Sequence, residues 1–295
     1  MQKKEKLEFH HQLLLEAKFK NLNLNLSEYA FANLYLFRMK HAYELLFEDE
    51  LFIKGRTREG QPFLMPTSHP KEWSKETFKF ICEQPDPLYP IPFEWLGYFE
   101  KYSKSFSFYE ADSDYLFLTD KIALYPGRNL SKKRSLVKQL FEQHQVKSCL
   151  FQSEYKREAL EIIEMWQDET SFDKDETDYN SVVEAIHFYD ELHLHGRLYL
   201  VDGTPKGILI GESLNNSCFA FHFVKASRSV HGLNQFMFQD FTQSLEKKYQ
   251  LLNFEQDLGL PNLRQTKHSY QPDQLLQKYH VYLAEHGTSD STKKK

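Results

Sequence analysis

Hydrophobic positions in the last third of the chain follow two different periods. Three runs with strand-like patterns are joined by short turns rich in Asp, Gly, Asn and Pro, and a segment with helical period follows them. These runs predict three consecutive antiparallel strands and then a helix, at 197–201, 207–212, 218–224 and 233–248. Two further helical patterns, 154–167 and 179–191, precede the strands, so this region predicts a mixed α/β unit.

The first 125 residues show a smaller version of the same alternation. Strand-like runs occupy 50–56, 61–66 and 114–118, and helical patterns occupy 5–19, 27–38, 71–83 and 93–102. Residues 85–92 and 120–130 carry proline or glycine and predict connections. We therefore expect a first domain over 1–125 and a second over 126–285, with a bridging helix near 130–144 and a disordered tail over 286–295.

One short stretch gathers charge where a predicted strand gives way to a helix. The apolar run 251–254 predicts the strand, and a turn with Gly and Pro follows it. Glu255 and Asp257 leave the strand, while Arg264 and Lys267 lie three residues apart on one side of the helix. We expect the four to converge at a strand end, where open α/β sheets bind ligands. The alternative is a salt-bridged corner without chemistry.

Basic residues are dense at the start of the predicted bridging helix. Such a cluster at a helix N-terminus can hold a tRNA backbone, a CoA phosphate or a lipid head group. The alternative is an ordinary solvated helix face. The cluster consists of Arg128, Lys132, Lys133, Arg134 and Lys138.

Composition excludes several classes of protein. Hydrophobic residues at 41%, with 25 Phe and 17 Tyr, predict a folded protein with an aromatic core. A net charge of −5 provides no general positive field for DNA, so any RNA or anionic lipid must bind locally. Three widely spaced cysteines predict reduced thiols in the cytoplasm, and no run of about 18 apolar residues predicts a membrane span. The close histidine pairs, His10-His11 and His193-x-His195, lack an acidic or Cys partner at ligand spacing, so no metal site is expected.

The charged stretch resembles the closing motif of a known family. An acid-rich strand end, a Gly turn, the Leu263-Arg264 pair, Lys267 and Tyr270-x-Pro272 follow in the order found in the C-terminal domain of bacterial phosphatidylglycerol lysyltransferases and their soluble relatives. Two other stretches fit the same family, namely Phe31-x-Asn33-Leu34-Tyr35-x-Phe37-Arg38 and Gly127-Arg128 before Lys132-Lys133-Arg134. The lysyltransferases carry a membrane-embedded flippase ahead of this domain. The present sequence has no such segment, which leaves the acceptor open.

The resemblance and the order of elements imply an α/β fold of two GNAT-like domains in tandem, the type found in acyl-CoA N-acyltransferases, with mixed, mostly antiparallel sheets flanked by helices. Acyl transfer needs a positioned donor, hydrogen-bond donors for the oxyanion and a route for the proton. In such domains a splayed strand supplies the oxyanion donors, here the backbone N–H groups of 223–226. We expect the site to lie between the two halves and to be centred on the second.

The resemblance also suggests roles for individual side chains. Glu212, Glu255 and Asp257 are candidates to bind an ammonium group or to act as the base, and Tyr270 is a candidate proton donor to the leaving oxygen. Arg264 and Lys267 would neutralise a phosphate or a negatively charged acceptor.

The loop after the predicted third strand bears on the acyl donor. CoA-dependent members of the fold bind the diphosphate on a loop with two small residues, whereas the stretch from Arg228 to Asn234 has one glycine, Gly232. This favours aminoacyl-tRNA as donor over acyl-CoA, with a lipid, peptide or amine as acceptor. The alternatives are a CoA-dependent N-acyltransferase and a non-enzymatic binding protein that keeps the fold.

Overall fold

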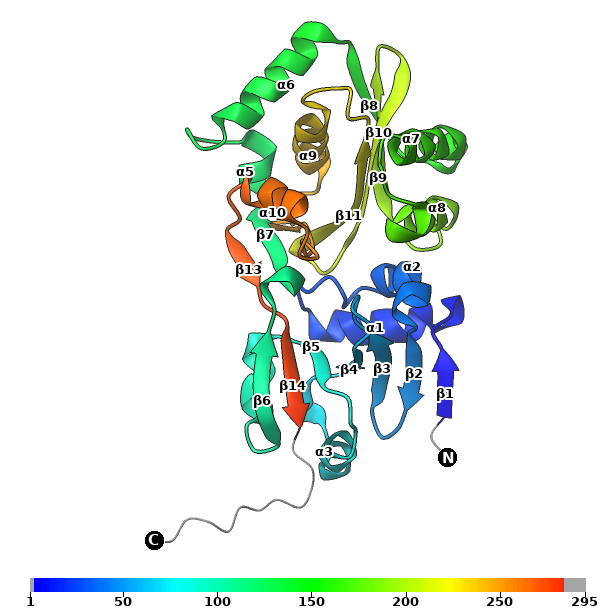
Figure 1. Ribbon diagram of the computed structural model, residues 1–295, viewed down its shortest axis with the longest axis vertical. Helices are drawn as coiled ribbons and strands as arrows, with labels where there is room; N and C mark the ends of the chain where they lie inside the picture. The colour runs from blue at the N-terminus through cyan, green and yellow to red at the C-terminus, as the bar shows by residue number, and fades with distance from the viewer. Residues whose placement is uncertain (1–2, 284–295) are drawn as a thin grey trace. The chain divides into compact units, whose positions relative to one another are not determined.

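The computed structural model describes residues 3–283, and these form two compact units (Figure 1). Within the described range, the first unit contains residues up to 24, 37–113 and 276–283, and the second contains 25–36 and 114–275. The expected tail over 286–295 lies outside the described residues. None of the helices that the structure describes is long and apolar enough to cross a membrane.

The first unit is built on a mixed sheet of seven strands in the order β1-β2-β3-β4-β5-β14-β6. Its strands pair antiparallel, except β4 with β5, which are parallel. The strands are β1 (Lys3–Lys6), β2 (Glu44–Phe47), β3 (Leu51–Arg56), β4 (Pro62–Pro66), β5 (Leu88–Ile91), β6 (Ser103–Phe108) and β14 (Tyr279–Leu283). The helices are α1 (Gln12–Leu22), α3 (Lys75–Cys82) and α4 (Leu96–Phe99), and α2 (Phe31–His41) has its first residues in the second unit.

The second unit also contains a seven-stranded sheet, in the order β13-β7-β12-β11-β10-β9-β8. Its strands are β7 (Asp114–Leu118), β8 (Val146–Leu150), β9 (His195–Val201), β10 (Thr204–Ser213), β11 (Cys218–Ala226), β12 (Leu251–Asn253) and β13 (Gln274–Leu276). Strands β8 to β11 pair antiparallel, with β9, β10 and β11 joined as a meander, while β11 and β12 are parallel. The predicted boundary between residues 125 and 126 falls inside this unit, because β7 pairs with β12.

Helices cover both faces of the second sheet. Figure 1 shows α7 and α8 on one face of β9–β11 and α9 on the other. The helices of this unit are α5 (Thr119–Leu124), α6 (Ser131–Gln143), α7 (Lys156–Asp168), α8 (Tyr179–His187), α9 (Leu233–Ser244) and α10 (Pro261–His268). The core under α9 is strongly aromatic, as the composition predicts, with Phe219, Phe221, Phe238 and Phe254 in ring contact. Each such ring stabilises the fold by about 1.5–3 kcal/mol through burial.

Several elements differ from those predicted from the sequence. Residues 5–19 were expected to be one helix, but Lys3–Lys6 is a strand paired with β2, and α1 begins at Gln12. The stretch 85–92 was expected to be a connection, but it contains β5, which lies between β4 and β14. The stretch 120–130 was likewise expected to be a connection and contains most of α5.

Candidate functional site

A β-bulge in β11 sets the position of the first candidate residue, His222. The register between β10 and β11 shifts between Ile210 and Gly211, which face Phe223 and Phe221, so His222 has no direct partner on β10. Gly211 permits this close approach, because a Cβ there would lie 2.0 Å from the carbonyl oxygen of Ala220. Bulges of this kind redirect side chains and are frequent beside functional sites.

Next to the bulge, strands β11 and β12 separate. Their parallel pairing covers Cys218–Ala220 with Leu251–Asn253, whereas β11 continues to Ala226 against β10. In an antiparallel pair every second residue turns its N–H away from the partner strand. Alternate backbone N–H groups between 221 and 226 therefore face the side from which β12 has separated. This is the splayed strand expected from the sequence, and the expected oxyanion donors at 223–226 lie on it.

Glu212, His222 and Glu255 form a hydrogen-bonded cluster across this separation. The ring of His222 lies between the two carboxylates, with Nε2 2.8 Å from Oε1 of Glu212 and Nδ1 2.6 Å from Oε1 of Glu255. Asn33 donates from Nδ2 to the same oxygen of Glu255 at 3.0 Å. The His222 side chain is 1% exposed, while those of Glu212 and Glu255 are 13% and 19% exposed, so the carboxylates have access to solvent that the imidazole lacks.

The cluster carries one net negative charge. Burial alone would lower the pKa of His222, but the charges and hydrogen bonds of Glu255 and Glu212 raise it to about 10. Because each ring nitrogen faces a carboxylate oxygen, both nitrogens carry a proton and the ring is an imidazolium. Two carboxylates and one imidazolium leave a charge of −1. Within residues 3–283, neither Oε2 of Glu212 nor Oε2 of Glu255 has a hydrogen-bond donor, so both oxygens remain able to accept one.

The backbone holds Glu255 in an uncommon conformation. Its φ is 58°, in the left-handed region that costs a non-glycine residue roughly 1 kcal/mol or more. Its N–H donates to Oδ1 of Asn253 at 2.6 Å, and the amide of Asn253 in turn donates to Asp114 and to the carbonyl of Asn25. Asn253 and Asp114 are fully buried, so this polar network fixes the direction in which Glu255 leaves β12.

Asp257 belongs to a different arrangement, in which its charge is neutralised. Arg264 donates from Nε and Nη2 to its two oxygens at 2.7 and 3.1 Å, and the Tyr115 hydroxyl and the Gly259 N–H complete four hydrogen bonds. Burial alone would raise the pKa of Asp257, but these partners hold it below its usual value. Asp257 is 0% exposed while the Arg264 side chain is 38% exposed, so this ion pair joins the buried end of β12 to the surface of α10.

The other two predicted residues of this stretch contact neither carboxylate of the cluster. Lys267 donates from Nζ to the carbonyl oxygens of Glu255 and Gln256, which fastens α10 to the turn after β12. Tyr270 lies in the core against Phe238 and Tyr125, and its burial raises its pKa. The structure therefore brings Glu212 and Glu255 together and places Asp257, Arg264, Lys267 and Tyr270 in supporting contacts.

The five members of the basic cluster differ in their contacts. Arg134 is exposed, and its guanidinium donates to the carbonyl oxygens of Tyr125 and Gly127. Lys133 donates to Ser269 at 2.6 Å and lies 3.8 Å above the Tyr270 ring, and burial lowers its pKa to about 8. Arg128 and Lys132 are exposed, as is Lys138 beside Glu142. Of the five basic residues, Arg128 and Lys132 thus remain at the surface for an anion, and Lys138 lies at the surface beside a carboxylate.

The remaining predicted residues lie on the loop between β11 and α9. Arg228 contacts Glu169, from Nη1 to the carbonyl oxygen at 3.0 Å and from the backbone N–H to the carboxylate at 2.6 Å. Asn234 is exposed in the first turn of α9. Neither residue contacts the Glu212–His222–Glu255 cluster.

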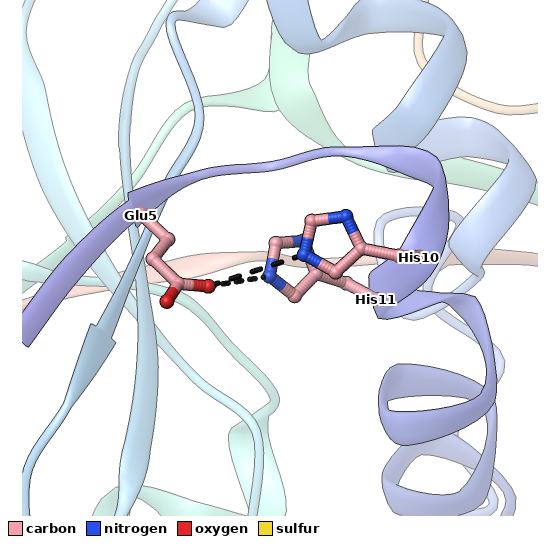
Figure 2. Close-up of side chains that lie close together, drawn as sticks. All are labelled: Glu5, His10 and His11. Carbon is pink, nitrogen blue, oxygen red and sulfur yellow. Dashed lines mark hydrogen bonds and ion pairs between the residues drawn. The ribbon is translucent and has the colours of Figure 1, made fainter.

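A group of potential metal ligands lies in the first unit. Figure 2 shows His10 and His11 beside Glu5. Sequence spacing did not indicate this contact, because it depends on the turn after β1 that brings the two histidines back to Glu5. Nδ1 of His11 accepts the Glu8 N–H at 3.1 Å, so the proton of the neutral ring is on Nε2, which donates to Glu5 at 3.1 Å. A metal on that Nε2 would require the opposite tautomer. The geometry is that of a capped 3-10 helix at Phe9–His11.

Sequence reasoning missed the two side chains that connect the site, His222 and Asn33. A single histidine in an apolar strand has no motif, and its position depends on the bulge. The signal that was present is Gly211 next to Glu212, because a glycine inside a strand pattern indicates a bulge or a close backbone approach. Asn33 was part of a motif but is 222 residues away from Glu255 in sequence.

The fold and the site together define a class of protein. Two mixed sheets flanked by helices, with a splayed and bulged strand in the second, make this a tandem GNAT-like α/β protein. A conserved protein of unknown function from Bacteroides thetaiotaomicron has a similar structure, with a TM-score of 0.81 at 20% identity, over 96% of this chain and 100% of that one. L-PGS from Bacillus licheniformis has a TM-score of 0.60 at 12% identity, over 92% of this chain and 91% of that one. FemX has a TM-score of 0.57 at 10% identity, over 96% of this chain and 98% of that one.

The sequence assigns the chain to a particular family within this class. It belongs to the family of phosphatidylglycerol lysyltransferase C-terminal domains, whose model matches residues 19–282. The resemblance expected from the motifs is thereby confirmed, and so is the fold class. No curated protein matches the sequence significantly.

Proposed function

We propose that this protein transfers an aminoacyl group from aminoacyl-tRNA to an acceptor hydroxyl or amine, and that Glu212 and Glu255 bind the ammonium group of the aminoacyl donor. The supporting observation is the cluster itself, in which a buried imidazolium holds two partly exposed carboxylates, each with one oxygen that accepts no hydrogen bond from the described residues 3–283. An ammonium group has three N–H donors and one positive charge, which match two acceptor oxygens and a net charge of −1.

The location of the cluster supports the same assignment. It lies where β11 separates from β12, beside backbone N–H groups that face the opening between them. An ammonium group held there places the adjacent ester carbonyl of the donor near these N–H groups. Donors aimed at a developing oxyanion typically contribute 10²–10³ in rate each. Membership of the phosphatidylglycerol lysyltransferase C-terminal family supports transfer of an aminoacyl group. The proposed acceptor is a lipid, a peptide or a small amine.

A transfer assay with charged tRNA tests this function. Total tRNA charged with radiolabelled amino acids is incubated with the protein and, in separate reactions, with anionic vesicles, a short peptide and hydroxylamine as a generic nucleophile. We expect protein-dependent transfer of at least one amino acid, reduced about a hundredfold in Glu255→Gln, which corresponds to about 2.7 kcal/mol of transition-state stabilisation. The matched control is Glu246→Gln, because Glu246 is exposed and pairs with Lys248. Loss of aminoacyl-tRNA at the spontaneous rate in every reaction would rule the function out.

A further inference from the structure

The loop between β11 and α9 is occupied by a carboxylate from the chain itself. Glu169 follows α7, and its Oε1 accepts from the Ser227 hydroxyl at 2.8 Å while its Oε2 accepts from the Arg228 N–H at 2.6 Å. Its carbonyl oxygen accepts from Nη1 of Arg228 at 3.0 Å. Ser227 is 1% exposed, so the carboxylate contacts a built, largely buried donor and not a mobile surface group.

A second ion pair holds this part of the chain against the strand. Lys225 is buried, donates to Asp178 at 2.6 Å and lies 3.6 Å above the Trp166 ring. Trp166 is on α7 and Asp178 precedes α8, so the connection that carries Glu169 is anchored to β11 on both sides. The carboxylate is therefore positioned before any ligand arrives, and displacing it would break contacts at Ser227 and Arg228 together.

Acyl-CoA is the alternative donor for this fold, and CoA-dependent members bind its diphosphate on the loop after the third strand of the meander. The residues present do not fit it. The Ser227 hydroxyl and the Arg228 N–H at the start of the loop already hold the Glu169 carboxylate, and a diphosphate placed beside them would face a like charge at contact distance. The single glycine of the loop serves packing, because a Cβ on Gly232 would lie 2.3 Å from the Leu136 carbonyl oxygen of α6. Its φ of 86° also requires glycine.

We propose that Glu169 is a specificity-determining residue, an internal anion that excludes CoA and other diphosphates from the loop 227–232, and that removing its carboxylate opens an anion-binding site there. The exclusion does not depend on the proposed aminoacyl transfer, since it concerns binding at a loop that the Glu212–His222–Glu255 cluster does not contact. It narrows the class of donor to those that do not need a diphosphate at this position.

Equilibrium binding tests the proposal without any assay of activity. CoA and inorganic diphosphate are titrated by calorimetry into the wild type, Glu169→Gln and Glu169→Ala, and the fold of each variant is checked by its thermal midpoint. The side-chain amide in Glu169→Gln has the shape of the carboxylate but no charge. This variant therefore still tests the proposal if Glu169→Ala does not fold. The matched control is Glu161→Gln, which removes an exposed carboxylate from α7, the helix that Glu169 follows.

We expect no binding of either ligand to the wild type or Glu161→Gln at 1 mM, and at least tenfold tighter binding to both Glu169 variants. Adding Arg228→Ala to Glu169→Gln should remove the gain, which locates the new site at the loop. Submillimolar binding of CoA to the wild type would overturn the proposal, and so would variants of Glu169 that bind no better than Glu161→Gln. Neither of these results bears on transfer from charged tRNA, which the assay above tests separately.

Discussion

Glu255 and Asp257 lie two residues apart in the chain but belong to different ionic clusters. The two clusters differ in whether their charge is balanced. Asp257 meets Arg264 in a two-point ion pair, accepts two further hydrogen bonds and is 0% exposed. Glu255 shares His222 with Glu212, keeps one free oxygen and is 19% exposed. The first cluster is satisfied internally, whereas the part of the chain that the structure describes leaves the second with one uncompensated negative charge and two carboxylate oxygens without a donor.

On the proposed function, this difference separates a structural role for Asp257 from a binding role for Glu255 within one motif. A buried carboxylate that is fully paired cannot receive a ligand without losing its partner, and breaking such a pair is costly. A cluster with excess negative charge and free acceptors is completed by a cation. Substitutions in the two clusters should therefore affect different measurements, stability in the first and ligand binding in the second.

The largest effect is expected for Arg264→Ala. It leaves the buried Asp257 without its cation, which should lower the free energy of unfolding by about 3–5 kcal/mol. Urea denaturation measures this change, and Gln265→Ala, on an exposed position of the same helix, should stay within about 0.5 kcal/mol of the wild type. A change below about 1 kcal/mol for Arg264→Ala would show that Asp257 does not need the ion pair.

The second largest effect is expected for His222→Gln. It should lower the free energy of unfolding by about 3 kcal/mol at pH 6.5, the lower end of the range for a broken buried ion pair. The pKa of His222 is raised from an unfolded value of roughly 6.5 to about 10, so the protonated ring stabilises the fold fully below pH 6.5. This contribution declines as the pH rises towards 10. The stability difference between wild type and variant should therefore shrink over that window.

Denaturation curves at pH 6.5, 8 and 9.5 measure this trend. The control is His195→Gln on β9, where burial lowers the pKa of the histidine and no such decline is expected. A difference that stays constant from pH 6.5 to 9.5 would mean that His222 is not protonated between the carboxylates.

Glu212→Gln should act mainly on binding. It removes one charged acceptor from the proposed ammonium position, and a hydrogen bond to a charged group contributes about 1.5–3 kcal/mol, so affinity for amino-acid amides should fall roughly ten- to hundredfold. Calorimetric titration at pH 6.5 measures the affinity. Unchanged affinity in a folded variant would exclude Glu212 from the site.

The smallest effect is expected for Asn33→Ala. Its amide donates one hydrogen bond to Glu255, which is also held by His222, so affinity for the same amides should fall by about fivefold, equivalent to about 1 kcal/mol. A loss as large as that of Glu212→Gln would indicate that Asn33 contacts the ligand itself.

Much of the second unit was predictable from the sequence, and the arrangement of its charges was not. The meander, α9 and β12 follow from local periodicity and turn residues, which short stretches of sequence contain. Local pattern predicted a strand at 114–118 but could not place it in the second sheet, because its partner β12 lies more than 130 residues away. Local pattern also could not predict that Asp257 contacts Arg264 while Glu255 contacts His222. These contacts depend on the left-handed conformation of Glu255 and on the bulge opposite Gly211.

The sharpest test compares Glu255→Gln with Asp257→Asn, the same acid-to-amide change two residues apart. Amino-acid amides with acidic, neutral and basic side chains are titrated into each folded variant at pH 6.5, together with their Nα-acetylated forms, of which the neutral one carries no ammonium group. We predict at least tenfold weaker binding of the amides to Glu255→Gln, wild-type affinity in Asp257→Asn, and no binding of the acetylated neutral amide to the wild type. Equal losses in the two variants, or none at Glu255→Gln, would contradict the assignment of Glu212 and Glu255 as the ammonium site.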